Sequence, residues 1–313
     1  MTREAAGLEP QQSVTTATLG TSLSTAQTPA TRRRTQVLWR LMKSKPLGAA
    51  AAAIILLIVF AAIFAGVLAP YDPLFTHPEI RLAPPSFSHP FGTDDIGRDV
   101  FSRIIYGARI SLWVGLLAVG IGTFAGTIIG LTCGYWEGRI DLVLQRFMDA
   151  LMAIPGLILA MAIVSVLTPN TTNAMLAIAV VIIPGNSRIV RGAVLSAKQN
   201  PYVEAARALG CPHWRIIVKH ILPNVTAPIL IIASIWLGNA IFIEASLSFL
   251  GLGTQPPTPS WGLMLSSTGR AFMEQAPWLA IFPGLAISLA VLGFNLFGDT
   301  LRDIWDPKLR GRS

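Results

Sequence analysis

The sequence NPYVEAARALGCPHWRIIVKHILPN, residues 200–224, is the long polar interruption in the apolar second half of the chain. Asn200 followed by a proline predicts a helix start, because asparagine is a good N-cap and proline is tolerated at the first helical position. Gly210 should end this helix, since glycine adopts a positive φ easily, and Pro212 can begin a second helix that lasts until Pro223. The stretch therefore predicts two short helices joined by a bend, which we call the elbow (residues 200–224).

The first helix of the elbow has one apolar side. Val203, Ala206 and Leu209 recur at every third position, whereas Glu204 and Arg207 point elsewhere. Such spacing places the apolar residues on one helical face. We expect this face to pack against the rest of the protein.

The composition of the chain is that of a membrane protein. Of its 313 residues 52% are hydrophobic and 13% charged, whereas soluble domains contain roughly 25% charged residues. The net charge of +8 is scattered beside apolar runs and not gathered on one face, so we predict contact with a lipid bilayer and not with nucleic acid. Two cysteines, Cys133 and Cys211, are too few for a disulfide framework, and we interpret both as reduced.

Six apolar runs are long enough to cross a bilayer core of roughly 30 Å. Pro155 and the glycine after it should bend or break the third run, and the fourth should continue as a helix past Arg191. Gly122 and Gly126 in the second run predict close contact with another helix. We predict an all-α membrane protein with six transmembrane helices, at residues 47–69, 110–136, 150–167, 174–191, 225–243 and 276–298.

The distribution of basic residues predicts the orientation. With the N-terminus inside, most of the 24 Lys and Arg residues fall on the cytoplasmic side, and those left outside are Arg81, Arg98, Arg103, Arg109 and Arg270. Both termini and the elbow should then be cytoplasmic. We expect a disordered tail over residues 1–45, a six-helix membrane domain over 46–300 that includes the elbow, and a short tail over 301–313.

The elbow resembles the EAA loop of the integral membrane subunits of bacterial ABC importers. Glu204, Ala205 and Ala206, followed by Gly210 and then by Leu222 and Pro223, match this motif, although His220 stands where a general form of it has isoleucine. The resemblance implies a cytoplasmic coupling helix that docks on a separate ATPase. It assigns the coupling role to Glu204, Ala205, Ala206, Arg207, Gly210, Leu222 and Pro223.

Three further segments narrow the resemblance. FGTDDIGRDVFSRIIYGARISL (91–112), SFLGLGTQPPTPSWG (248–262) and PWLAIFPGLAISLAVLGFNLFGDTLRDIWDP (277–307) are similar to the dipeptide, oligopeptide and nickel permease family, and to its second, C-type membrane subunit. The resemblance implies a type I ABC importer permease of the bacterial inner membrane that translocates peptides. The implied partners are a homologous second permease subunit, two cytoplasmic ATPase subunits and an extracytoplasmic substrate-binding protein. Nickel or glutathione remains open as an alternative cargo.

The chain lacks the motifs of an enzyme. No G-x-x-x-x-G-K-[ST] phosphate loop occurs, so the ATPase should be another polypeptide, and ATP and magnesium should bind there and not here. The four histidines show no metal-ligand spacing, and no serine–histidine pattern suggests a hydrolase. We therefore expect a non-catalytic transport subunit without a cofactor or metal. An ATP-independent secondary transporter is the less favoured alternative, because the middles of the six runs lack charged residues.

Two groups of polar residues have open roles. We favour Asp94, Asp95 and Asp99 as a turn stabilised by aspartate side chains, and the alternative is a loop that helps to receive a substrate-binding protein. Glu244, Asn239 and Pro155 are candidates for the translocation path, although an interhelical or snorkelling role for Glu244 is favoured. Arg146 and Asp149, three positions apart on a helix, should form a local ion pair.

Overall fold

A computed structural model describes residues 46–266 and 271–305, and all of its regular elements there are helical. The chain divides after Lys43, and every described residue belongs to the second unit. The predicted disordered tail (1–45) lies outside the described residues, and the last helix continues past the predicted boundary at 300. The elements are α2 (Pro46–Ile63), α3 (Ala65–Leu68), η1 (Pro78–Ile80), α4 (Val100–Trp136), α5 (Gly138–Met152), α6 (Gly156–Leu167), α7 (Thr171–Lys198), α8 (Pro201–Ala208), α9 (His213–Arg215), the π-helix η2 (Ile216–Ile221), α10 (Leu222–Phe249), α11 (Trp261–Leu265) and α13 (Trp278–Trp305).

The helices follow the six predicted runs in order. Within residues 46–266 and 271–305, five continuous helical segments are long and apolar enough to cross a membrane, and α5 with α6 makes a sixth if this pair is counted as one span. The pair is bent by 91° where Pro155 and Gly156 interrupt it, as predicted. The fourth run is one helix, α7, that contains Pro184 and continues past Arg191 to Lys198.

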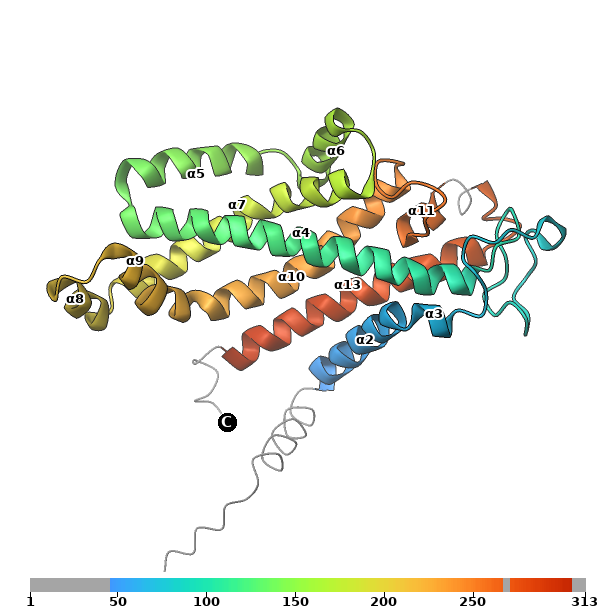
Figure 1. Cartoon of the computed structure of the whole chain (residues 1–313), viewed down its shortest axis with the longest axis horizontal. Coiled ribbons are helices and arrows are strands. Elements are labelled where there is room, and N and C mark those ends of the chain that lie inside the picture. The colour runs from blue at the N-terminus through green and yellow to red at the C-terminus, as the bar shows by residue number, and fades with distance from the viewer. Residues whose placement is uncertain (1–45, 267–270, 306–313) are drawn as a thin grey trace, which may run out of the picture. The chain divides into compact units, whose positions relative to one another are not determined.

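Glycines bring α4 and α7 into close backbone contact, and the two helices lie side by side in Figure 1. A Cβ atom added to Gly122 would lie 2.7 Å from the carbonyl oxygen of Ala179, and one added to Gly126 would lie 2.9 Å from that of Ile183. Gly130 and Gly134 repeat the contact at the next two turns. The predicted small-residue packing is therefore confirmed, because only glycine leaves room for the backbone of α7.

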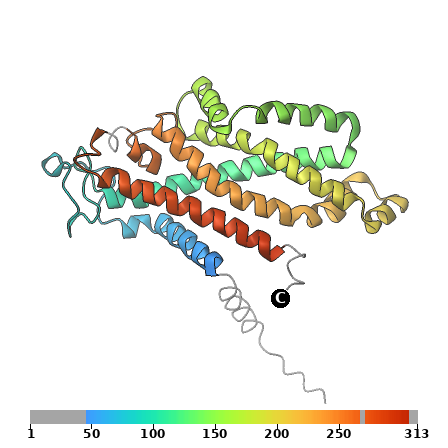
Figure 2. The ribbon, with the colours of Figure 1, turned by 180° about the vertical axis from the view of Figure 1, so that it is seen from behind.

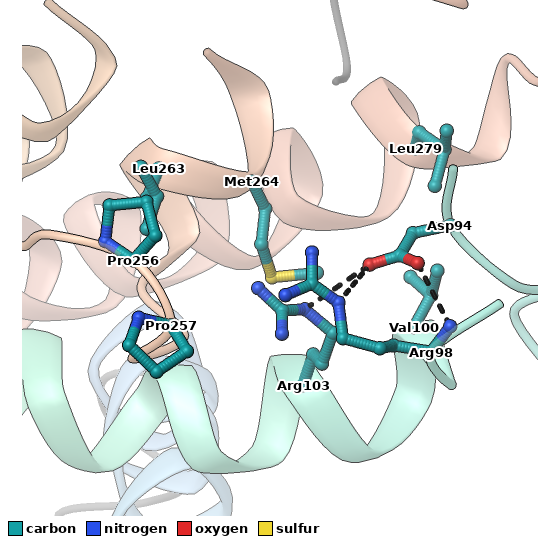
Figure 3. Close-up of a pocket in the computed structure, with 9 residues that line it drawn as sticks. All are labelled: Asp94, Arg98, Val100, Arg103, Pro256, Pro257, Leu263, Met264 and Leu279. Atoms are coloured by element: carbon teal, nitrogen blue, oxygen red, sulfur yellow. Dashed lines mark hydrogen bonds and ion pairs between the residues drawn. The ribbon is translucent and has the colours of Figure 1, made fainter. Parts of the chain in front are cut away.

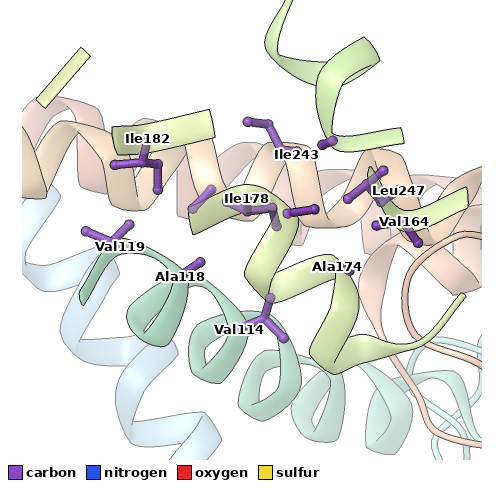
Figure 4. Close-up of a cluster of buried hydrophobic side chains, with 12 residues drawn as sticks. Val114, Ala118, Val119, Val164, Ala174, Ile178, Ile182, Ile243 and Leu247 are labelled. Atoms are coloured by element: carbon purple, nitrogen blue, oxygen red, sulfur yellow. The ribbon is translucent and has the colours of Figure 1, made fainter. Parts of the chain in front are cut away.

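A buried apolar cluster joins α4, α6, α7 and α10. Figure 4 shows Val114 and Ala118 of α4 facing Ile178 of α7, with Val164 of α6 and Leu247 of α10 beside them. A second cluster packs α2 and α13 against α4 and α10, with Trp261 of α11 among its members. The two clusters hold α10 in the middle of the bundle, with α4 on one side of it.

Candidate functional site

The first helix of the elbow ends as its glycine predicts. Gly210 has a φ of +74°, and its N–H donates to the carbonyl of Arg207 at 3.0 Å. The N–H of Cys211 donates to the carbonyl of Ala206 at 3.1 Å. These two bonds form a Schellman motif, which requires a residue that tolerates the left-handed conformation. Gly210 therefore makes the bend of the elbow.

Asn200 occupies the predicted N-cap position of α8, but its side chain has a different role. Its amide Nδ2 donates to the carbonyl of Ala197 at 2.9 Å, and it makes no capping bond to α8. The side chain thus bonds to a backbone carbonyl at the C-terminal end of α7. It can reach this carbonyl because only two residues separate α7 from α8. The prediction of a capping side chain was wrong for α8.

The predicted apolar face of α8 is partly correct. Val203 and Ala206 are buried in a cluster with Ile216 and Ile221, whereas Leu209 is 84% exposed. Leu209 is the C-cap residue, with a ψ of 5° that is no longer helical. The helix ends before Leu209, so the every-third spacing no longer places this residue on the buried face. The prediction that Leu209 packs against the protein was wrong.

The second elbow helix does not end at Pro223, contrary to the prediction. From His213 to Phe249 the chain is one helical segment, in which η2 is π-helical and Pro223 lies in the first turn of α10. In η2 the N–H of Leu222 donates to the carbonyl of Ile217, five residues earlier. This wider turn accommodates the proline, whose ring would clash with the carbonyl four residues back in an α-helix.

Polar contacts fasten the elbow to the bundle. The hydroxyl of Tyr135, near the end of α4, lies 2.6 Å from Nδ1 of His213 in α9. Lys198 at the end of α7 donates to the carbonyl of Tyr135 at 2.8 Å and pairs with Glu137 at 2.6 Å. The Tyr135–His213 contact and the buried face of α8 join the elbow to α4, α7 and α10, whereas the Lys198 contacts join α7 to the end of α4.

The predicted coupling residues divide between the surface and the interior. Glu204, Ala205, Arg207, Gly210 and Pro223 are exposed, Leu222 is half-buried and Ala206 is buried. The exposed set is available to a partner, whereas Ala206 packs inside the elbow. The surface also includes large apolar side chains that the motif did not indicate: Leu209, Trp214 (61% exposed) and Val218 (51% exposed).

Ion pairs attach α5 to α7. Asp149 pairs with Arg188 at 2.5 Å, and Asp141 pairs with Arg191 at 2.5 Å. The predicted local pair of Arg146 with Asp149 is therefore replaced by a contact between helices. The sequence contained no local signal for these pairs, because their members lie 39 and 50 residues apart.

The aspartate turn (residues 93–99) is held by its own side chains, as the favoured prediction states. Asp94 accepts hydrogen bonds from the N–H groups of Ile96 and Arg98, and its other oxygen lies 2.6 Å from Nε of Arg98 and 3.8 Å from Nε of Arg103 (Figure 3). Asp99 caps α4 by accepting from the N–H of Ser102 at 2.8 Å. These bonds engage Asp94 and Asp99 inside the turn.

The three candidate path residues do not lie together. Glu244 is 1% exposed, and its carboxylate accepts hydrogen bonds from Ser111 of α4 at 2.9 Å and from Ser248 at 2.8 Å. Asn239 is exposed on another side of α10, and Pro155 is exposed at the bend between α5 and α6. Glu244 therefore connects α4 to α10, which supports its interhelical role.

The sequence matches two family models. Residues 126–311, more than half of the chain, match the model described as binding-protein-dependent transport system inner membrane component. Residues 34–85 match the N-terminal transmembrane domain of oligopeptide transport permease C. The first match covers α5 to α13 and includes the elbow.

Related proteins extend the similarity to most of the chain. The dipeptide transport system permease protein of Alkalihalophilus pseudofirmus is 46% identical over 86% of this chain and 88% of its own length. A glutathione transport system permease protein of Escherichia coli is 46% identical over 87% and 90%, and a probable D,D-dipeptide transport system permease protein of E. coli K12 is 43% identical over 88% and 92%. The solved structure of the MetNI methionine ABC transporter, in inward-facing conformations, gives a TM-score of 0.48 at 21% identity and covers 63% of this chain and 95% of the matched chain.

Proposed function

The chain belongs to the family of binding-protein-dependent transport system inner membrane components, and from this premise we propose that it conducts short peptides as one permease subunit of an ATP-driven importer. The chain is a multi-pass membrane protein, and its family consists of inner membrane components of bacterial transport systems. In the proposed complex it pairs with a homologous permease subunit. Two ATPase subunits supply the energy, and an external binding protein delivers the peptide.

The observation that carries this proposal is that the elbow is buried on one side and exposed on the other. Its buried side is fixed to three long helices, while Glu204, Arg207 and Leu209 are exposed around the bend at Gly210. A segment that is rigidly attached on one side and exposed on the other can pass a partner's movement into the bundle. We propose that this partner is the ATPase, and that Glu204, Ala205, Arg207, Gly210 and Pro223 form the contact surface.

The single helical segment from the elbow to Phe249 supports the same assignment. His213 lies beside the bend, and Phe249 lies at the opposite end of α10. A displacement of α9 is therefore passed along one backbone and not through a flexible loop. We propose that ATP-driven movement of the elbow reaches the far end of α10 by this route.

Charge supports the proposed orientation. The predicted inner segments, including the elbow and both termini, hold most Lys and Arg residues. We propose that the elbow faces the cytoplasm and that the aspartate turn faces the binding protein. Because this chain lacks a phosphate-binding loop, we also propose that ATP and magnesium bind to the ATPase subunits.

The proposed cargo is a dipeptide or another short peptide. Two of the similar permeases are named for dipeptide or D,D-dipeptide transport, and one for glutathione transport. We place glutathione second, because one of these permeases is named for it, and nickel stays a further alternative. A cargo panel with labelled dipeptide, glutathione and nickel will rank them directly.

Reconstitution in vesicles tests the proposal. The complete transporter should import labelled dipeptide only with ATP, and omission of the ATPase subunits should abolish uptake. Glu204→Lys should insert and assemble but lose ATP-driven uptake, whereas a Ser165→Ala control at an exposed position of α6 should transport normally. Uptake by this chain without the ATPase would overturn the proposal, as would unchanged uptake by the Glu204→Lys complex.

A further inference from the structure

A groove lies between α2 and α4. Figure 2 shows α2 beside α13 at the edge of the bundle, and four of the 18 residues of α2 are buried. The groove has a volume of about 570 Å³, within the range of small-molecule sites. Val59 of α2 and Trp113 and Leu116 of α4 line it, together with Ile241 of α10 and Phe294 of α13, which are both buried. We call it the α2–α4 groove.

The α2–α4 groove contains a single charge among the described residues that line it, and this charge is Arg109. Arg109 is exposed and directly precedes the uncharged residues 110–136 of α4. Its Nε donates to the carbonyl of Ala62 at 3.0 Å, and Nη2 donates to that of Ile63 at 3.2 Å. These two carbonyls belong to the last residues of α2. The guanidinium therefore lies level with the ends of two spans, where the apolar core meets the lipid headgroups.

Arg109 keeps both hydrogen-bonding capacity and charge. A guanidinium has five N–H groups, and the bonds to α2 engage two of them, which fixes the group and leaves the others for a ligand. The two carbonyls carry only a partial negative charge. Arg98 and Arg103 share the carboxylate of Asp94, but no ion pair between described residues includes Arg109. An anion can therefore bind at Arg109 and neutralise it.

The side chains along the groove are ordered like the parts of a phospholipid. Arg109, Trp113 and Leu116 recur after four and three positions, which places them on one face of α4. A cation is followed by an indole, whose ring has one polar N–H, and then by an aliphatic side chain further into the span. A phospholipid presents its phosphate, its ester groups and its hydrocarbon chains in the same order.

A second recess on α2 shows what the charge adds. It has a similar volume, about 540 Å³, and is lined by Leu57 and Phe60 but by no charged residue among those described. Lipid chains can fill either recess through apolar contact. Of the two, the α2–α4 groove is the one that also offers a cation to a headgroup, so it can select one kind of lipid from another.

We propose that the α2–α4 groove binds an anionic phospholipid, with its phosphate at Arg109 and one acyl chain along Trp113 and Leu116. An anionic headgroup such as phosphatidylglycerol has no ammonium group to weaken the attraction to Arg109, so it is preferred over a zwitterionic one. A helix of another protein would have to bring a carboxylate to the same depth, which is costly in a membrane. The bound lipid holds α2 against α4. This proposal does not depend on the cargo.

Lipid titration of the purified transporter tests the site. A ligand that binds the folded state raises the midpoint of thermal unfolding, so phosphatidylglycerol and phosphatidylcholine are compared by this shift. Arg109→Gln should weaken the apparent affinity for phosphatidylglycerol about fivefold, the effect of one basic residue at an anionic surface, and leave that for phosphatidylcholine nearly unchanged. Arg81→Gln removes an exposed arginine from the same predicted side and should match the parent. Equal affinities of Arg109→Gln and the parent for phosphatidylglycerol would overturn the proposal.

Filling the groove gives a second test that leaves Arg109 in place. Leu116→Trp puts a larger side chain where the acyl chain binds, so the preference for phosphatidylglycerol should disappear while the subunits still assemble. Leu56→Trp changes an exposed residue of α2 outside the groove and should keep the preference. A preference retained by Leu116→Trp would overturn the acyl-chain site. Loss of subunit assembly in Leu116→Trp alone would also overturn it, because the groove would then be a contact with another protein.

Discussion

The elbow and the aspartate turn are two polar segments for which the sequence suggested functional roles. They differ in which side chains are buried: charged ones in the turn and apolar ones in the elbow. In the aspartate turn the carboxylate of Asp94 is buried and pairs with Arg98 and with Arg103 of α4: the side chains of Asp94 and Arg103 are 6% and 5% exposed. In the elbow the apolar side chains of Val203 and Ala206 are buried, and the charged Glu204 is exposed. One polar segment thus forms an internal scaffold, and the other presents an open surface.

This difference indicates where a substitution should affect folding and where it should affect function. A buried charge that loses its partner is costly, whereas an exposed charge already interacts with water. The turn should therefore respond mainly in stability and the elbow mainly in transport. The four predictions below test this division, from the largest expected change in stability to the smallest.

Asp94→Ala should give the largest effect. It leaves the guanidinium groups of Arg98 and Arg103 without their shared carboxylate in a buried site, which costs about 3–5 kcal/mol. Thermal unfolding of the purified complex should show a clear drop in the midpoint. Asp94→Asn keeps an acceptor oxygen and should lose less. An Asp94→Ala midpoint equal to that of the parent would show that the turn is not the scaffold we describe.

Gly97→Ala should come second. Gly97 has a φ of +79°, and a Cβ atom there would collide with the carbonyl oxygen of His77. The left-handed backbone alone costs an ordinary residue about 1–2 kcal/mol, and the collision adds to that. The midpoint of thermal unfolding should therefore fall further for Gly97→Ala than for Gly210→Ala in the elbow.

Gly210→Ala is that matched change and should cost only the backbone term. Gly210 has a φ of +74°, but a Cβ atom there would meet no heavy atom within 4 Å. We expect a loss of about 1 kcal/mol, and a smaller loss for Gly210→Asn, because asparagine tolerates the left-handed region. If Gly210→Ala proves as destabilising as Gly97→Ala in the same unfolding assay, the elbow is more tightly enclosed than the structure indicates.

Glu204→Lys should change stability least. Glu204 is exposed on α8, so we expect a shift in the free energy of unfolding below about 0.5 kcal/mol. ATP-driven uptake should nevertheless fall, because a charge at the proposed ATPase contact is reversed. An unfolding midpoint that drops as far as that of Asp94→Ala would remove the contrast between the two segments.

Local pattern predicted those features of the elbow that depend on single residues. Gly210 makes the bend because few other residues adopt its φ, and α8 begins directly after Asn200, as the proline at the first helical position indicates. The pattern was wrong for Leu209 and Pro223. The first lies just beyond the last helical residue of α8, and the second is accommodated by a π-helical turn that no proline rule anticipates.

Side-chain partners were harder to predict than helices. Asp149 was assigned to Arg146 because the two share a helix, yet it pairs with Arg188 of α7. Glu244 and Asn239 were both candidates for the translocation path, yet Glu244 is buried and Asn239 is exposed on another side of α10. A charged side chain can pair with a residue of another helix as readily as with a neighbour on its own helix. Which residue of the other helix is near enough depends on how the helices pack.

The sequence by itself determined the membrane class, the order of the spans, the break at Pro155 and the bend at Gly210, because hydrophobic length, proline and glycine act through the local backbone. The tertiary structure alone decided which face of each helix is covered. It set the carbonyls of α7 against the glycines of α4, buried Glu244 against Ser111 of α4 and left Asn239 of α10 exposed. Those outcomes depend on the rotation of whole helices about their axes, which no short segment of sequence specifies.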